Sequence, residues 1–323
     1  MNPDLDRLRP YPFERLAALF EGVRPAADRT PIALSIGEPG HAPPALAGAA
    51  IEASLAGLGR YPATRGSDEL RGAIADWLQA RYGLEALSAD EQVLPVNGTR
   101  EALFAFAQAV VDRRRGPTVV LPNPFYQIYE GAALLAGAEP VYVPLDGSGL
   151  ADFDRLDASA WERCQLLYLC SPGNPSGAVL GMTALQRLIE RAHAHDFVIA
   201  ADECYAELYA DEAAPPPGLL QAARQAGYPG FDRCVVFHSL SKRSSLPGLR
   251  SGFVAGDADI LARFARYRTY HGCAMAPPLQ AASVAAWRDE AHVHANRAAY
   301  RAKFDQVLSI LEPALPVARP AGG

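Results

Sequence analysis

The sequence predicts an α/β fold, in which a three-layer, doubly wound domain on a mostly parallel sheet is followed by a second, smaller domain. Three observations support this prediction. From about residue 93 onward, short apolar runs alternate with longer amphipathic ones, as strands and helices do in such folds. The short runs are rich in Val, Ile and Leu without polar alternation, which indicates strands buried on both faces. The 323 residues, 50% of them hydrophobic, suffice for one large core and a further domain.

The expected elements follow in order along the chain. Strands are predicted at residues 93–96, 118–121, 140–143, 165–169, 197–201, 234–237 and 252–255. Helices are predicted at residues 100–111, 126–136 and 182–195. Residues 279–311 read as a long helix, or a kinked pair, that leaves the sheet. Because strands alternate with helices, most of the sheet should be parallel, with right-handed crossovers.

This pattern divides the chain into three parts. We expect residues 1–36 to be an N-terminal segment of the small domain, residues 37–286 the large domain, and residues 287–323 the start of the small C-terminal domain. The last eight residues look like a chain cut at a turn into a strand, so the small domain is expected to be incomplete.

Composition excludes several classes of partner. The formal net charge is −6, and the one basic cluster, the arginine triplet 113–115, is expected at the solvated end of a helix. We therefore expect neither nucleic acid nor a membrane as a partner. The five cysteines are odd in number and scattered, and no signal-peptide pattern opens the chain. These features predict a reducing compartment, and the cytoplasm is the expected location.

The strongest local signal is a segment of serine, lysine and arginine residues that directly follows the apolar run 234–237. Ser239 and Ser241 can donate to phosphate oxygens, and Arg250 can bind them with its forked guanidinium. Lys242, if desolvated, would be a nucleophile able to form an imine. Taken alone, the segment reads more simply as a solvated loop, because such Ser/Lys strings are common.

A second polar motif closes the apolar run 197–201. Asp202 at the carboxyl end of a strand suits a pyridinium nitrogen, and Tyr205 could bond a ring oxygen of the same ligand. The alternative reading is a helix cap at Asp202 and a core aromatic at Tyr205.

Two further segments also follow apolar runs. In residues 171–177, prolines and glycines fix a loop whose Asn174 amide could reach the same ring oxygen, although a plain turn would explain them too. Thr99 and Arg100 open a helix whose free N–H groups could bind a phosphate, with simple capping as the alternative. Tyr126, at a strand-to-helix junction, could stack on a cofactor ring or belong to the core.

Together these motifs resemble the class I/II pyridoxal-phosphate aminotransferases of fold type I. The resemblance runs from residues 36–39 through 60–62 to the Ser-x-Ser-Lys segment. Residues 95–106, 123–131 and 267–275 resemble more closely the N-succinyl-diaminopimelate aminotransferases of bacterial lysine biosynthesis.

The resemblance implies a role for each residue. Lys242 would carry pyridoxal 5′-phosphate and shuttle a proton between the substrate Cα and the cofactor. Asp202 would pair with the pyridinium nitrogen, Tyr205 and Asn174 with the 3-oxygen, and Tyr126 with the ring face. The phosphate would be bound by Thr99 and Arg100 through backbone N–H groups, and by Ser239, Ser241 and Arg250. Tyr61 would reach the phosphate of the partner subunit in a homodimer, and Gly37, with Asn174, would contact the substrate.

The implied reaction transfers an amino group between glutamate and N-succinyl-2-amino-6-oxopimelate. Such a substrate carries extra carboxylates and calls for a further cationic side chain that the sequence does not identify. Family members bind the substrate α-carboxylate through an arginine that would lie beyond Gly323. The 323-residue chain is therefore expected to hold cofactor but to transaminate poorly.

Other functions remain open from the sequence. Aspartate or acetylornithine specificity, a pyridoxal-phosphate β-lyase or decarboxylase, and an inactive cofactor-binding fragment are the alternatives. A regulatory sensor domain would need a DNA-binding module that is not recognisable here. No G-x-G-x-x-G follows a strand, which disfavours a nicotinamide enzyme. The pairs His193/His195 and His292/His294 point in different directions on helices, so no metal site is expected.

Overall fold

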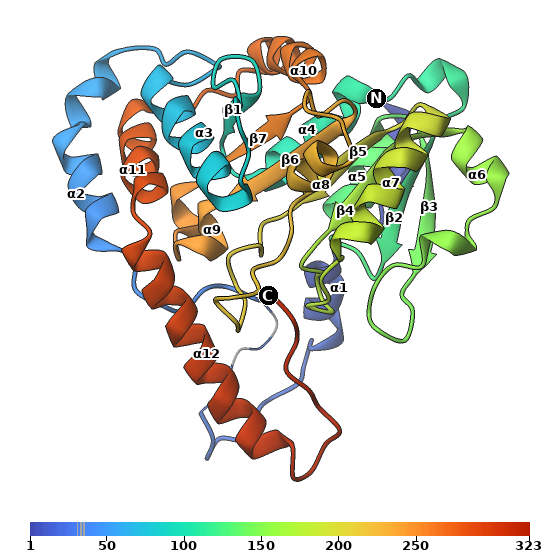
Figure 1. The fold of residues 1–323 in the computed structure, drawn as a ribbon. Coiled ribbons are helices and arrows are strands. Elements are labelled where there is room, and N and C mark those ends of the chain that lie inside the picture. Colours follow the sequence, from blue (N-terminus) through green and yellow to red (C-terminus); the bar gives the residue numbers. More distant parts are fainter. Residues whose placement is uncertain (31, 33, 35) are drawn as a thin grey trace.

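The fold centres on one seven-stranded sheet in the order β1-β7-β6-β5-β4-β2-β3 (Figure 1). The computed structural model describes residues 1–323 except 31, 33 and 35, which fall in the expected N-terminal segment. The strands are β1 (Val93–Val96), β2 (Thr118–Asn123), β3 (Glu139–Pro144), β4 (Cys164–Cys170), β5 (Val198–Asp202), β6 (Cys234–Ser239) and β7 (Gly252–Gly256). Only β7 runs antiparallel to its described neighbours, β1 and β6, which confirms the mostly parallel sheet.

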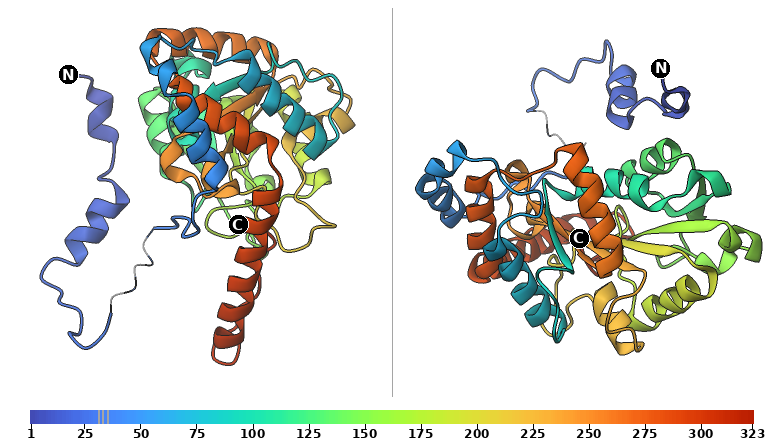
Figure 2. Two further views of the ribbon diagram at one scale, coloured as in Figure 1. Left: turned by 90° about the vertical axis from the view of Figure 1, so that its left-hand side faces the viewer. Right: turned by 90° about the horizontal axis from the view of Figure 1, so that it is seen from above.

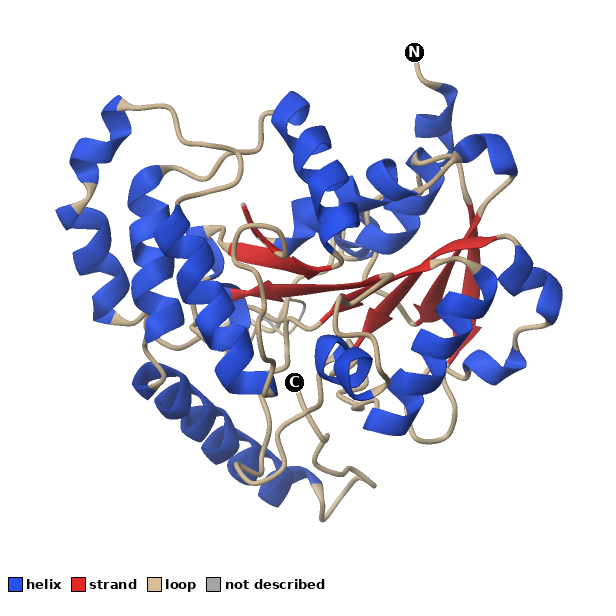
Figure 3. Ribbon diagram, turned by 45° about the horizontal axis from the view of Figure 1, so that its top comes forward, coloured by secondary structure: helices blue, strands red, loops and turns tan. Residues whose placement is uncertain are grey.

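Helices cover both faces of the sheet (Figure 3). The helices of the described residues are α1 (Pro12–Leu19), α2 (Ala45–Ala53), α3 (Asp68–Tyr82), α4 (Thr99–Val110), α5 (Ile128–Leu135), α6 (Ala158–Glu162), α7 (Met182–His195), α8 (Leu219–Gln225), α9 (Leu240–Arg243), α10 (Ala258–His271), α11 (Pro277–Arg288) and α12 (Ala291–Leu311). Short 3-10 helices lie at Pro3–Arg7, Leu55–Gly59, Arg113–Arg115, Phe153–Arg155 and Pro247–Leu249. The arginine triplet therefore forms a separate turn after α4 rather than the end of that helix, because the backbone is extended at Val111 and Asp112.

The core has two halves, one on each side of the sheet. Alternate residues of one strand point to opposite faces, so Val235 packs with α4, α5 and α10, while Val236 packs with α3, α7, α8 and α11. Both faces of the central strands are thus apolar. This explains why their sequences show continuous apolar runs, and it confirms the three-layer prediction.

The carboxyl ends of the parallel strands meet at one edge of the sheet. Asp202 ends β5 and Ser239 ends β6, and in the ladder register Ser239 pairs with Gly252, which opens antiparallel β7. Arg250, just before β7, therefore returns to this edge. The segments that the sequence identified after separate strands are brought together by this topology.

The C-terminal helical region is a kinked pair. α11 packs on α2 and α3. α12 projects away from the sheet, whereas α1 lies on the outside of the rest of the chain (Figure 2). The break between α11 and α12 falls at Asp289 and Glu290. The first two turns of α12 are buried at Val293, Asn296 and Arg297, and the rest of the helix is more exposed.

Candidate active site

A cavity of about 770 Å³ opens at the carboxyl edge of the sheet. Apart from Tyr61, every site residue that the sequence identified lines it. Its other lining residues come mainly from the N-terminal segment and from the ends of strands. The cavity brings together residues that are up to 239 positions apart in the sequence, between Tyr11 and Arg250.

One end of the cavity suits a phosphate group. Gly98, with φ +87°, precedes α4, and the first N–H groups of that helix have no acceptor within it. A side chain at position 98 would collide with the guanidinium of Arg250, so glycine is what allows Arg250 to reach the helix start. The hydroxyl of Ser239 accepts the backbone N–H of Ser241 at 3.1 Å and donates to the Ser241 hydroxyl at 2.9 Å. Hydroxyls, a guanidinium and a helix N-terminus thus converge on a position that suits an anion.

Asp202 is buried to 5% exposure. Burial raises the pKa of its carboxyl, and hydrogen bonds from Cys204 and Tyr129 oppose that rise. The Tyr129 hydroxyl donates to Oδ2 at 2.7 Å, and the Cys204 backbone N–H donates to Oδ1 at 3.2 Å. A cationic ring nitrogen placed here would relieve the cost of burying the carboxylate.

Lys242 lies in the single-turn helix α9, and its Nζ donates to the backbone oxygen of Gly37. Burial lowers the pKa of its amine, and charges at Cys204 and Glu38 partly offset this. A lowered pKa increases the unprotonated fraction, which is the nucleophilic form. The chain contains only two lysines, and the other, Lys303, is exposed on α12.

Two tyrosines and an amide line the same cavity as the amine. The Tyr205 ring centroid is 5.8 Å from Lys242 Nζ. Burial raises the pKa of Tyr126 to about 12 and that of Tyr205 above its ordinary value, so both hydroxyls remain protonated donors near neutral pH. Asn174 also lines the cavity, from the loop that follows β4.

Tyr61 is outside this cavity and fully exposed at 104%. It follows the 3-10 helix Leu55–Gly59, whose Leu55 and Leu58 side chains are also exposed. That Tyr61 reaches the cofactor phosphate of a partner subunit stays a prediction.

The sequence reasoning missed several residues of the site. Tyr11 and Phe13, at the start of α1, line the cavity together with Gln127. The Tyr11 hydroxyl accepts hydrogen bonds from Gln127 Nε2 at 2.7 Å and from the Arg100 guanidinium. Nothing in the local sequence of α1 indicates this contact, because Tyr11 and Arg100 are brought together only by tertiary folding. Tyr129 was detectable in principle, since it lies one helical turn after Tyr126.

Two classes of site find no support among the residues that the structure describes. No group of three or more His, Cys, Asp or Glu side chains there could hold a metal ion. In the same part of the chain, no helix combines the length and apolarity needed to cross a membrane.

The similarity of the sequence to known proteins identifies the family. Residues 29–323 match the family model described as aminotransferase class I and II. The chain belongs to this family. Its members depend on pyridoxal 5′-phosphate, and the chain is a transaminase of this kind.

Individual relatives agree with this assignment. The chain is 35% identical, over 96% of its length and 79% of the relative's, to a 4-dedimethylamino-4-oxo-anhydrotetracycline transaminase of Streptomyces rimosus. Among solved structures, an aminotransferase from Neisseria meningitidis has a TM-score of 0.96 at 46% identity, over 100% of this chain and 82% of that one. A probable N-succinyldiaminopimelate aminotransferase from Thermus thermophilus has a TM-score of 0.81 at 26% identity, over 90% and 77%. The chain spans 62% to 79% of the length of the first curated relatives it matches.

Proposed function

We propose that this transaminase moves an amino group between glutamate and N-succinyl-2-amino-6-oxopimelate, giving N-succinyl-LL-2,6-diaminopimelate in the diaminopimelate route to lysine. The observation that carries the cofactor assignment is the cavity in which Lys242, Asp202 and the start of α4 face one another. The similarity to the Thermus thermophilus protein supports the choice of substrate.

In this proposal, residues of the large domain (37–286) hold pyridoxal 5′-phosphate. Lys242 would bond the carbonyl carbon of the cofactor, and Asp202 would pair with its ring nitrogen. Tyr205 and Asn174 would hydrogen-bond its 3-oxygen, and Tyr126 would stack on its ring. Its phosphate would be bound by Thr99, Arg100, Ser239, Ser241 and Arg250. When bound, the cofactor supplies an electron sink for the electron pair left at the substrate Cα. As a free amine, Lys242 would be the base that removes the proton from the substrate Cα and passes it to the cofactor's carbonyl carbon, on the other side of the substrate nitrogen.

Arg100 supplies a reason to expect an acidic substrate. The described residues that line the cavity include three cations, Lys242, Arg250 and Arg100, against one carboxylate, Asp202. Lys242 and Arg250 have cofactor roles, and Arg100 needs only its backbone N–H for the phosphate. Its guanidinium, held by the Tyr11 hydroxyl and lying 5.3 Å from that ring's centroid, is therefore available for a substrate carboxylate.

We further propose a homodimer in which Tyr61 serves the partner's cofactor. Its complete exposure beside Leu55 and Leu58 supports a covered surface there. Mixing Lys242→Ala chains with Tyr61→Phe chains tests this, because one shared site in the hybrid then carries neither change. Recovery of activity on mixing is the expected result, and equal activity of mixed and unmixed samples would contradict it.

The two lysines make the cofactor test direct. Borohydride reduction of the cofactor-loaded protein, followed by peptide mass analysis, should find pyridoxyl on the peptide with Lys242. Lys242→Ala should lose the visible absorption of the bound cofactor, and Lys303→Ala is the matched control that should keep it. A cofactor band retained in Lys242→Ala would refute the assignment.

The substrate test compares amino donors on the loaded protein. Glutamate and N-succinyl-diaminopimelate should convert the bound cofactor to its amine form, whereas release of ammonia and an oxo acid would indicate a β-lyase instead. Arg100→Gln should slow both donors by about 10- to 100-fold, as loss of a charged hydrogen bond does. Preference for aspartate or acetylornithine would replace the proposed substrate but leave the cofactor assignment intact.

A further inference from the structure

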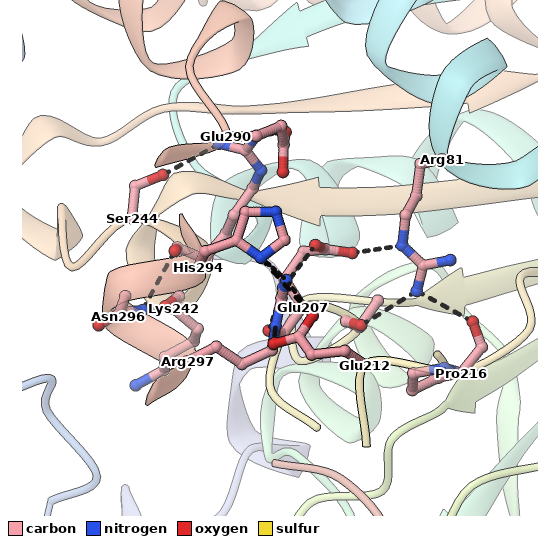
Figure 4. Close-up of polar contacts among 12 residues, drawn as sticks. Arg81, Glu207, Glu212, Pro216, Lys242, Ser244, Glu290, His294, Asn296 and Arg297 are labelled. Atoms are coloured by element: carbon pink, nitrogen blue, oxygen red, sulfur yellow. Dashed lines mark hydrogen bonds and ion pairs between the residues drawn. The ribbon is translucent and has the colours of Figure 1, made fainter. Parts of the chain in front are cut away.

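A buried amide lies outside the cofactor cavity, where α12 meets α9. Asn296, in the second turn of α12, is 8% exposed. Its Nδ2 donates to the backbone oxygens of Lys242 at 3.0 Å and Arg243 at 3.1 Å. Figure 4 shows the Asn296 side chain beside Lys242. A helix of the C-terminal region therefore holds the backbone of the lysine itself.

The length of α9 makes this contact important. α9 contains four residues, Leu240–Arg243, so its last carbonyls have no acceptor role within the helix. Carbonyls left unpaired in a buried position are costly, and a single amide group from Asn296 satisfies two of them. Because α9 is one turn long, a shift at its end moves the Cα of Lys242 directly.

The oxygen of the Asn296 amide contacts the segment 37–41, whose first residue, Gly37, lines the cavity. Its Oδ1 lies 2.7 Å from Nδ1 of His41 and 3.5 Å from the hydroxyl of Ser245. Since Nδ2 faces two carbonyls, Oδ1 is the acceptor and His41 donates. His41 lies four residues after Gly37, whose oxygen accepts the Lys242 amine. One side chain thus joins the backbone of the lysine to the segment that its amine contacts.

The helix that carries Asn296 is itself fixed. The neighbouring Arg297, 2% exposed, pairs with Glu207 at 3.2 Å and with Glu212 at 2.8 Å. Its guanidinium also lies 4.3 Å from the ring centroid of Tyr209. Glu207 in turn pairs with Arg81 of α3 at 2.6 Å (Figure 4). These charges anchor the start of α12 to the loop after β5 and to α3.

α9 has a second attachment to the same region. The guanidinium of Arg243, 2% exposed, lies 5.3 Å from the ring centroid of Trp77 and 4.7 Å from that of Trp287. It donates to the backbone oxygen of Ala286 at 2.8 Å and pairs with Glu290. Arg243 fixes where α9 lies, and Asn296 fixes the carbonyls at its end.

We propose that Asn296 is a positioning residue for Lys242. Asn296 fixes the position of the lysine backbone relative to the cavity and links that backbone to the segment 37–41. Asn296 does not line the cavity. It acts through the position of the amine, and a misplacement of about 1 Å can cost about 100-fold in rate.

Two substitutions separate the two ends of the amide. Asn296→Asp keeps the size and the acceptor for His41, but it replaces the donor to the carbonyls of Lys242 and Arg243 with an oxygen. His41→Phe keeps a ring and removes only the bond to the segment 37–41. Gln306→Ala, at an exposed position on the same helix, is the control.

The readouts distinguish positioning from a purely structural role. In Asn296→Asp we expect slower uptake of pyridoxal phosphate by the apoprotein and a displaced midpoint in the pH titration of the cofactor absorption. The kcat should fall by about 10- to 100-fold, with KM changed by less than about threefold. His41→Phe should take up the cofactor normally and raise KM, and Gln306→Ala should match the parent protein.

Some results would overturn the proposal. A less stable Asn296→Asp protein with parental cofactor uptake, pH midpoint and kcat would show a structural role only. If Asn296→Asp does not fold, Asn296→Ser, which keeps one donor, is measured by the same criteria. Parental values for Asn296→Ser in all three readouts would equally refute positioning.

Discussion

The hydrogen bond from Tyr129 to Asp202 leads to a prediction that needs no substrate. Tyr129→Phe removes one hydroxyl and leaves the ring, which stacks on Tyr168 with a centroid distance of 4.7 Å. The hydroxyl donates to Asp202 Oδ2 at 2.7 Å in a fully buried position. Burial also raises the pKa of Tyr129 well above its ordinary value, so this donor stays protonated at every pH of interest.

The size and the pH dependence of the effect follow from the charge on Asp202. A hydrogen bond to a charged group contributes about 1.5–3 kcal/mol, which is about 10- to 150-fold in the unfolding equilibrium constant. The folded-state pKa of Asp202 is raised by burial, so ionisation already destabilises the apoprotein as pH rises from the ordinary carboxyl value through this raised pKa. Losing the hydroxyl raises that pKa further. The penalty in Tyr129→Phe is therefore small at low pH and full once the carboxylate is ionised.

The assay is denaturant unfolding of the apoprotein across the acidic to neutral range. Tyr168→Phe is the matched control, because its equally buried hydroxyl donates at 2.7 Å to the neutral backbone oxygen of Leu103. The free energy of unfolding of Tyr168→Phe should be lower than that of the parent protein by about 0.5–1.5 kcal/mol at every pH. Equal and pH-independent losses in the two variants would refute the conclusion that Tyr129 stabilises an ionised Asp202.

Two further predictions concern the phosphate end of the cavity. Gly98→Ala should lower the free energy of unfolding by about 1–3 kcal/mol. Because the new methyl displaces Arg250, the variant should also bind the cofactor at least about tenfold more weakly, as measured by equilibrium titration with pyridoxal phosphate. The control is Gly83→Ala, which is also at a positive φ but has open space around it. It should lose a similar free energy of unfolding and keep the parental affinity for the cofactor. A weakened affinity in this variant too would mean that backbone strain, and not the displacement of Arg250, causes the effect. Arg268→Leu should lower the free energy of unfolding, measured in denaturant, by about 3 kcal/mol. Arg268 is fully buried and pairs with Glu101, whose carboxylate accepts the N–H of Asn97 in the turn before α4. A loss below about 1 kcal/mol would contradict this.

Much of the fold could be predicted because the strands carry their signal locally. Val, Ile and Leu runs mark β4, β5 and β6 whatever surrounds them, and the helix Met182–His195 has the bounds that its pattern predicts. The polar motifs after these strands could be placed at one edge because parallel strands end together. The role proposed for Tyr61 lies outside that reasoning, since the topology of one chain does not show which residues of a second chain would reach its site.

The sequence by itself determined the sheet class, the family and the candidate lysine, because each depends on local patterns of residues and on their order. Only the tertiary structure decided that Tyr11 of α1 holds Arg100, that Tyr129 bonds Asp202 and that Asn296 holds the backbone of Lys242. The last of these joins residues 54 positions apart through one amide. Such contacts depend on how helices pack in three dimensions, and neither periodicity nor composition encodes which two side chains meet there.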